Sequence, residues 1–327
     1  MKPSQQTLSV AYDLNEQSHL MLRVFLTICF IAAMSAIVVA QPAAATTPPK
    51  KKIPEELKPR LEKIVTKDGV SLTMGYFPSD QGKEAVPVLL VHEWSGQTSP
   101  YINLAVKLQE AGCAVVLLDY RGHGRSRLLD PDGKPIEVER ATKRDMEAVM
   151  KMDMEAAKKF LRAENDADKI NLNALTVIGA GEGAVLAMNW TAMDWSWPSI
   201  GSKKQGQDVK AMVLISPPKS VNGVSGDPAL RHPAVARLPV MIVSGSGISE
   251  NSEANRLAKM FERARVTSKF NTDEPLPVEA HRVRENLSGA ELVVRSPNVV
   301  DAITTFVQQN VVKNIDMFPW VQRSDDD

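Results

Sequence analysis

The chain has 327 residues, of which 43% are hydrophobic and 24% charged, and its 39 basic and 39 acidic side chains cancel. This composition is typical of a globular protein and excludes a collagen-like, coiled-coil or wholly disordered chain. Because there is no basic excess, the composition gives no support for nucleic-acid binding. Two cysteines cannot build a disulfide scaffold, and no Cys/His cluster indicates a zinc site, so we expect neither metal nor cofactor.

The N-terminal part contains an almost wholly apolar run over 24–40, which follows Arg23 and ends in small residues. This order is typical of a secretory signal peptide. A signal peptide begins with a short basic segment before its apolar run, but here 20 mostly polar residues come first. A translation start at Met21 would leave the short basic segment Met21-Leu22-Arg23. The alternative is an uncleaved anchor, because the run is at the lower length limit for a membrane span. In both cases we expect an exported protein, periplasmic or extracellular. It would contact a membrane only if the apolar segment is not cleaved off.

Composition divides the chain into four parts. We predict a signal peptide over 1–40, a Pro- and Lys-rich linker over 41–62, one folded domain over 63–314 and a C-terminal tail over 315–327. The linker has few large apolar residues, and the tail ends in Ser-Asp-Asp-Asp, which indicates that both segments are solvated.

The domain begins with a predicted hairpin. Two alternating runs flank Asp68-Gly69, a dipeptide that is typical of tight turns between antiparallel strands. Short apolar runs without alternation follow, as expected for strands that are buried on both faces of a parallel sheet. These runs are 86–92, 114–119, 175–179, 209–216 and 239–245.

Helical patterns separate these runs and cover 102–111, 139–165, 184–194, 253–265 and 299–312. Alternating strands and helices imply right-handed crossovers and a doubly wound layer sandwich. We therefore predict an α/β fold in which a mostly parallel sheet of about eight strands lies between helices.

Two motifs stand at the ends of consecutive predicted strands. The first reads VHEWSG over 91–96, and the second, about 25 residues later, reads DYRGHGRS over 119–126. Together they resemble the oxyanion loop and the D-x-R-G-x-G-x-S strand end of the α/β-hydrolase superfamily, particularly its esterases and serine aminopeptidases. The His-Glu-Trp variant is also similar to dienelactone hydrolases. The resemblance covers about 63–312 and implies the α/β-hydrolase fold.

The nucleophile elbow of that superfamily has the pattern G-x-S-x-G between a strand and a helix. The matching stretch is Gly-Ala-Gly-Glu-Gly over 179–183, which puts Gly181 at the nucleophile position. Glycine has no side chain that could attack a substrate or form an acyl-enzyme. It adopts positive φ at little cost, so we expect the strained turn to be kept.

The resemblance also places the acid and the base of the triad. The acid position is Ile248, and Glu250 could take that role only if the loop shifts. The base position is Ser288, and the nearest histidine, His281, is expected inside the last strand. None of the three triad positions carries its usual group, which implies a member without an intact triad.

Five residues beside the elbow are candidates for binding: His92, Glu93, Trp94, Ser95 and Glu182. The backbone N–H groups of Trp94 and Glu182 would be the oxyanion donors, at a helix N-terminus that suits a carboxylate, phosphate or carbonyl ligand. Glu93 should lie close to Gly181. The structural alternatives are a His92 bonded to nearby backbone and a Glu93 bonded to a neighbouring loop.

Three functions are compatible with these residues. The first is an exported pseudoenzyme that binds a small molecule or a partner in the former active-site cleft. The second is an active hydrolase with relocated chemistry, in which Ser95 or Glu93 acts with His92; it needs a base within about 3 Å of the nucleophile. The third is a structural envelope protein that acts through its surface.

Overall fold

The computed structural model describes residues 54–127, 137–201, 203–267 and 278–323. The predicted signal peptide and most of the predicted linker lie outside these ranges. Within them, no helix combines the length and the apolar character that crossing a membrane requires.

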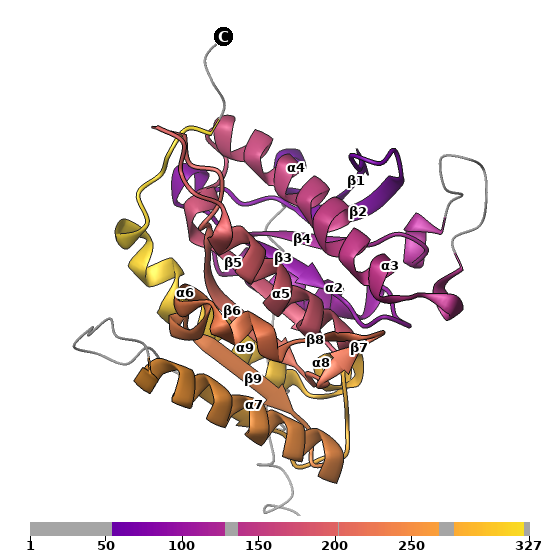
Figure 1. Ribbon diagram of the computed structural model, residues 1–327. Helices are drawn as coiled ribbons and strands as arrows, with labels where there is room; N and C mark the ends of the chain where they lie inside the picture. The colour runs from indigo at the N-terminus through magenta and orange to yellow at the C-terminus, as the bar shows by residue number, and fades with distance from the viewer. Residues whose placement is uncertain (1–53, 128–136, 202, 268–277, 324–327) are drawn as a thin grey trace, which may run out of the picture. The chain divides into compact units, whose positions relative to one another are not determined.

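An eight-stranded sheet runs through the domain in the order β1-β2-β4-β3-β5-β6-β9-β10 (Figure 1). Strand β2 is antiparallel to both of its neighbours, and all other pairs are parallel. The predicted mostly parallel sheet is therefore confirmed. The strands are β1 (Arg60–Val65), β2 (Ser71–Phe77), β3 (Val86–Val91), β4 (Cys113–Asp119), β5 (Leu175–Ala180), β6 (Val209–Ile215), β9 (Val240–Ser244) and β10 (Val278–Arg282).

The hairpin of β1 and β2 turns where the sequence predicts it. The Thr66 N–H donates to the Val70 carbonyl, and the Val70 N–H donates to the Thr66 side-chain hydroxyl, both at 2.9 Å. Strand β1 begins at Arg60, which pairs with Tyr76 of β2 and lies over its ring. The predicted linker therefore ends earlier than residue 62, because this cation–π contact extends the pairing.

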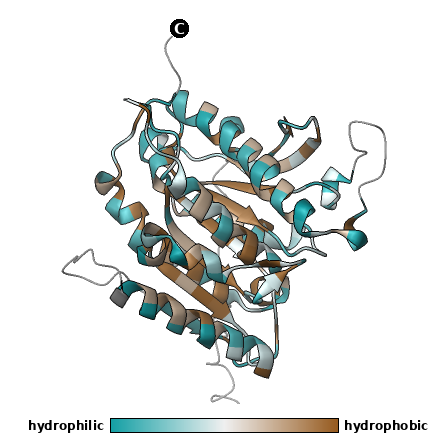
Figure 2. Ribbon diagram, viewed as in Figure 1, coloured by the Kyte–Doolittle hydropathy of each residue, from teal (hydrophilic) through white to brown (hydrophobic). Residues whose placement is uncertain are grey.

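Helices cover both faces of the sheet (Figures 1 and 2). On one face α2 (Ile102–Glu110) and α9 (Pro297–Asn310) bury their apolar residues together. On the other face lie α4 (Glu155–Asp166), α5 (Glu182–Ser196), α6 (Pro233–Arg237) and α7 (Ile248–Thr267). The remaining elements are short: α3 (Lys143–Ala148), α8 (Ala290–Arg295), and a small hairpin of β7 (Ser220–Val221) and β8 (Val224–Ser225).

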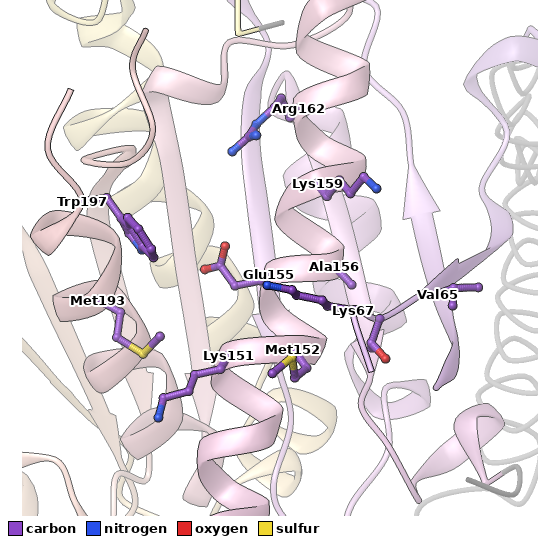
Figure 3. Close-up of a pocket in the computed structure, with 11 residues that line it drawn as sticks. Val65, Lys67, Lys151, Met152, Glu155, Ala156, Lys159, Arg162, Met193 and Trp197 are labelled. Carbon is purple, nitrogen blue, oxygen red and sulfur yellow. The ribbon is translucent and has the colours of Figure 1, made fainter. Parts of the chain in front are cut away.

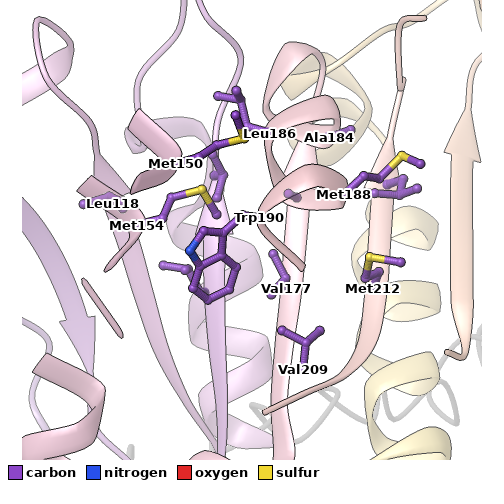
Figure 4. Packing of buried hydrophobic residues seen from close by; sticks show 14 of the residues in the cluster. Leu118, Met150, Met154, Val177, Ala184, Leu186, Met188, Trp190, Val209 and Met212 are labelled. Carbon is purple, nitrogen blue, oxygen red and sulfur yellow. The ribbon is translucent and has the colours of Figure 1, made fainter. Parts of the chain in front are cut away.

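The core beneath α5 is rich in methionine (Figure 4). Met150, Met154, Met188 and Met212 belong to the same buried cluster as Trp190. Unbranched methionine side chains fill irregular gaps, such as those around an indole ring. Trp190 is fully buried, and its Nε1 donates to the carboxylate of Glu155 at 2.7 Å, which satisfies its polar atom.

The single helix predicted over 139–165 is interrupted. Thr142 and Asp145 form a capping box that starts α3, and a π-helix over Val149–Met154 then joins α3 to α4. A capping box fixes the first residue of a helix because it satisfies backbone N–H groups that have no partner inside the helix. The Thr142 side chain therefore explains why the helix begins at Lys143 and not at residue 139.

The segment predicted as a tail from residue 315 packs against the domain as far as Arg323. The Trp320 indole donates to the carbonyl of Ile170 at 3.2 Å. Arg323 is buried and binds the carboxylate of Asp208 at 2.5 Å, and Lys158 binds the same carboxylate at 3.0 Å. A buried carboxylate needs cations beside it. That requirement explains why the domain extends beyond residue 314.

Candidate functional site

Gly181 lies at the sharp turn from β5 into α5, with φ 52° and ψ −128°. This is the conformation that favours glycine, and the elbow is where the sequence predicts it. A Cβ atom on Gly181 would lie 2.6 Å from Cγ of Glu93. The side chain of Glu93 therefore occupies the space into which a nucleophile would project.

Glu93 bridges two turns of nearly the same shape. Gly289, which precedes α8, has φ 50° and ψ −127°, and a Cβ there would collide with the Glu93 carboxylate. The same carboxylate accepts a hydrogen bond from the backbone N–H of Ala290. Glu93 thus ties the elbow to the loop that holds the base position, which agrees with the alternative of a bond to a neighbouring loop.

The first predicted oxyanion donor is already engaged. The backbone N–H of Trp94 donates to Oε2 of Glu182 at 3.2 Å. The pKa values of Tyr101 and Tyr120 lie well above the ordinary value for tyrosine. Burial is the largest cause, and the nearby carboxylates of Glu93 and Glu182 raise both pKa values further. An entering anion would meet two carboxylates here, so the geometry differs from the open anion site expected from the sequence.

The acid and base positions carry no acid or base. Ile248 is 92% exposed at the start of α7, and Ser288 is exposed in the loop before α8. His281 lies within β10, as predicted, on a strand at the edge of the sheet. These positions therefore do not assemble a triad.

Glu250 holds the loops together instead. Its carboxylate accepts hydrogen bonds from the Ser216 hydroxyl at 2.6 Å and from the Gly245 N–H at 2.9 Å. The Ser216 hydroxyl in turn accepts from the Gly289 N–H at 2.7 Å. This chain of bonds connects the loops after β6, β9 and β10, and no histidine takes part in it.

The His92 side chain is held inside the protein by backbone and by a stacked ring. Its ring is fully buried, Nδ1 lies 2.6 Å from the Glu93 carbonyl, and the ring stacks on Tyr120 at 4.1 Å between centroids. The Tyr120 hydroxyl donates to the carbonyls of His92 and Glu93 at 3.0 and 2.8 Å. Burial lowers the pKa of His92 to about 3, so the ring is neutral and fixes the oxyanion loop.

A cleft of about 510 Å³ lies beside this loop. Ser95 is exposed in it, and within the described ranges its hydroxyl has no hydrogen-bond partner. His123 is buried at the wall with Nδ1 2.9 Å from the Arg121 carbonyl, and burial lowers its pKa. The cleft is lined by Trp94, Ser95, Gly96, Gly122, His123, Arg127, Val138, Glu139 and Asn222.

Metal binding has no support in the part of the chain that the structure describes. No group of three or more His, Cys, Asp or Glu side chains there could hold a metal ion. The acidic pair Glu93 and Glu182 is bonded to backbone N–H groups instead.

The sequence matches the family model described as serine aminopeptidase, S33, over residues 82–305. An uncharacterized protein of Mycobacterium tuberculosis is 30% identical over 125 residues. That match covers 38% of this chain, and the chain spans only 38% of the length of that relative.

Solved structures of esterases are similar in fold. An esterase of Rhizomucor miehei has a TM-score of 0.54 and 17% identity, covering 79% of this chain and 85% of its own. The esterase Pf2001 of Pyrococcus furiosus has a TM-score of 0.52 and 16% identity over 78% and 91%. The esterase LipW of Mycobacterium marinum has a TM-score of 0.51 and 14% identity over 80% and 82%. At these identities the likeness concerns the fold.

Proposed function

Since the chain belongs to the serine aminopeptidase S33 family of α/β-hydrolases, we propose that it is an exported, non-catalytic member that binds a small molecule in the cleft beside its oxyanion loop. One observation supports this most directly: the Glu93 side chain fills the space between Gly181 and Gly289. A family member that works by acyl transfer needs that space for its nucleophile and for the substrate carbonyl.

The chemistry of the site supports the proposal further. Without a serine at position 181 there is no covalent intermediate. Without a histidine at position 288 the general acid–base contribution, about 10²–10⁴ in rate, is also lost. Of the two predicted oxyanion donors, the Trp94 N–H is bonded to the Glu182 side chain and would have to exchange this partner for a substrate oxygen.

The cleft offers a binding surface of mixed character. Arg127 and Glu139 supply opposite charges, and Trp94 and His123 supply aromatic surface. Its volume of about 510 Å³ is in the range of small-molecule sites. A polar ligand with a flat apolar part would match these groups.

A hydrolase with relocated chemistry is the second candidate, because the free hydroxyl of Ser95 shares the cleft with His123. Both nearby histidines are weak bases, because burial lowers the pKa of each ring. Nδ1 of each ring is bonded to a backbone carbonyl, so Nε2 is the atom that could take a proton, and both Nε2 atoms are buried. An active Ser95 would need one of these Nε2 atoms within hydrogen-bond reach of its hydroxyl.

Labelling with a fluorophosphonate probe and turnover of p-nitrophenyl esters test the choice. We expect no labelling of the wild type and no turnover above background. We expect the same for Gly181→Ser, because no base is supplied at Ser288. Turnover that follows the protein through purification and is lost in Ser95→Ala, but kept in the matched variant Ser249→Ala of an exposed serine outside the cleft, would show that the protein is an enzyme.

Export is tested separately by N-terminal sequencing of the secreted protein. We expect the mature chain to begin at Gln41 or Thr46, after the small residues that end the apolar run. A mature chain that still contains residues before Val24 would contradict cleavage, and retention of the protein inside the cell would contradict export.

A further inference from the structure

A second cavity, of about 490 Å³, shares no lining residue with the cleft beside the oxyanion loop (Figure 3). We call it the basic groove. Its walls come from the β1–β2 hairpin, the π-helix, α4 and the end of α5. The lining residues are Val65, Thr66, Lys67, Lys151, Met152, Glu155, Ala156, Lys159, Arg162, Met193 and Trp197.

Charge in the basic groove is strongly unbalanced. Four cationic side chains face one carboxylate, Glu155, which already accepts from the Trp190 indole at 2.7 Å. Lys151 has a surface partner in Glu147 at 3.0 Å. Within the described ranges the side chains of Lys67, Lys159 and Arg162 make no hydrogen bond or ion pair, although Arg162 interacts electrostatically with Glu155. One carboxylate does not balance four cations, so the basic groove attracts anions.

Arg162 carries the most specific signal. Its Nε atom is buried and has no acceptor within the described part of the chain. A buried donor without an acceptor is unfavourable, and an arginine fork suits a carboxylate, sulfonate or phosphate. In Figure 3 Arg162, Glu155 and Lys151 extend toward the side where Trp197 and Met193 lie.

The opposite wall is apolar. Trp197 is 49% exposed, and Met193 and Met152 lie in the same cavity. An exposed indole with adaptable thioethers beside it forms a surface for a flat or aliphatic body. The cavity volume matches that of small-molecule sites.

The backbone gives an independent indication. Lys151 and Met152 belong to the π-helix Val149–Met154. A π-helix is rare, and such segments are frequent at functional sites. Here it brings a cation and an apolar side chain to the same cavity.

We propose that the basic groove binds a small organic anion with an apolar or aromatic body, whose acidic group contacts Arg162 and Lys67 and whose body packs on Trp197. A single strand of nucleic acid fits less well, because its bases need several stacking rings and the basic groove has one. This proposal does not depend on whether the elbow is catalytic.

A matched pair of dyes tests the proposal on the full chain. 8-Anilinonaphthalene-1-sulfonate carries a sulfonate, and N-phenyl-1-naphthylamine has the same body without it. We expect the sulfonate to bind at one saturable site and the neutral dye to bind at least about tenfold more weakly, a difference of one charged contact. Equal affinity for the two dyes would overturn the proposal.

Variants then place the site. Arg162→Gln and Trp197→Ala should each weaken sulfonate binding about tenfold, and Arg162→Lys should recover part of it. Lys313→Gln, an exposed lysine outside the basic groove, is the matched control and should bind as the wild type does. Trp197 is half exposed, so its replacement should leave the protein folded. Unchanged dye affinity in both Arg162→Gln and Trp197→Ala overturns the proposal.

A vesicle arm separates a free anion from a lipid surface. Vesicles with 30% anionic lipid should not bind the wild type more tightly than neutral vesicles do. Tight binding to the anionic vesicles that is lost in Arg162→Gln would assign the basic groove to a membrane and overturn the small-anion proposal.

Discussion

At the elbow, the N–H groups of Trp94 and Ala290 each donate to a glutamate of the same chain, whereas in the basic groove the Nε of Arg162 has no acceptor among the residues that the structure describes. At the elbow, carboxylates of the protein itself occupy the hydrogen-bond donors. In the basic groove, no described carboxylate bonds to the Nε of Arg162, so this donor stays available to a ligand. The comparison teaches that the family's usual site position does not have to be where a member of the family has its free binding groups. Internal partners stabilise a site but also compete with any ligand.

The largest effect is expected on the stability of the protein in acid, through His92 of the oxyanion loop. The folded pKa of His92, about 3, is below its unfolded value of about 6.5. The contribution of neutral His92 to the free energy of unfolding is therefore fully present above pH 6.5 and is lost as the pH falls toward 3. Over that window the free energy of unfolding should fall by about 4–5 kcal/mol, at about 1.4 kcal/mol per unit.

Urea unfolding of the wild type and of His92→Gln between pH 7 and pH 4 measures this contribution. The variant should lose less stability on acidification than the wild type. His281→Gln, on the edge strand β10, is the control and should keep the wild-type slope. Equal slopes for the wild type and His92→Gln would show that the buried ring is not the source.

The next largest effect on stability is expected when the Glu93 carboxylate, which fills the space beside Gly181, is removed. Glu93→Ala leaves the Ala290 N–H without its acceptor and opens space beside Gly181, so we expect a loss of about 2–3 kcal/mol. Glu93→Gln keeps an acceptor oxygen and should lose less. Thermal and urea unfolding measure both, with Glu139→Ala, exposed in the cleft, as the control. A Glu93→Ala variant as stable as the control would mean that Glu93 is dispensable.

A smaller effect tests whether Glu93 and the elbow exclude each other. Gly181→Ala should destabilise the protein through its positive φ and through the contact with Glu93. In a Glu93→Gly background the contact with the Glu93 side chain is absent and only the strain of the positive φ remains. A double-mutant cycle should therefore give a coupling of about 1–2 kcal/mol. Additive effects would mean that the two side chains can share the space.

The smallest effect is expected in the basic groove. Because Arg162 makes no ion pair with any residue that the structure describes, Arg162→Gln should change the free energy of unfolding by no more than about 0.5 kcal/mol. Urea unfolding beside Glu93→Ala shows the contrast directly. A loss as large as that of Glu93→Ala would mean that Arg162 stabilises the domain and would remove the difference between the two regions.

The sheet could be predicted because its strands are short apolar runs that are buried on both faces, as in β3 and β4. The elbow could be predicted because glycine spacing reports backbone geometry directly, as Gly181 shows. The break at Thr142 was missed because the helical pattern continues through it. A Thr followed three residues later by Asp was the signal that could have marked it.

The contacts of the site were harder to predict. The proximity of Glu93 to Gly181 follows from the fold, but the bond from Trp94 to Glu182 depends on a side-chain conformation. The basic groove was missed because its pieces are far apart in the chain, at 65–67, 151–162 and 193–197. Only tertiary packing shows which of their charges remain unpaired.

The π-helix has a consequence for how this chain tolerates changes of length. Its turns hold one residue more than α-helical turns, and each residue of an α-helix rotates the chain by about 100°. Asp153, inside the π-helix, binds the N–H and side chain of Arg121, whereas Glu155 and Arg162 beyond it line the basic groove. Deleting one residue over 149–154 would turn Glu155 and Arg162 by about 100° relative to α3. The π-helix therefore sets which side of α4 lines the basic groove.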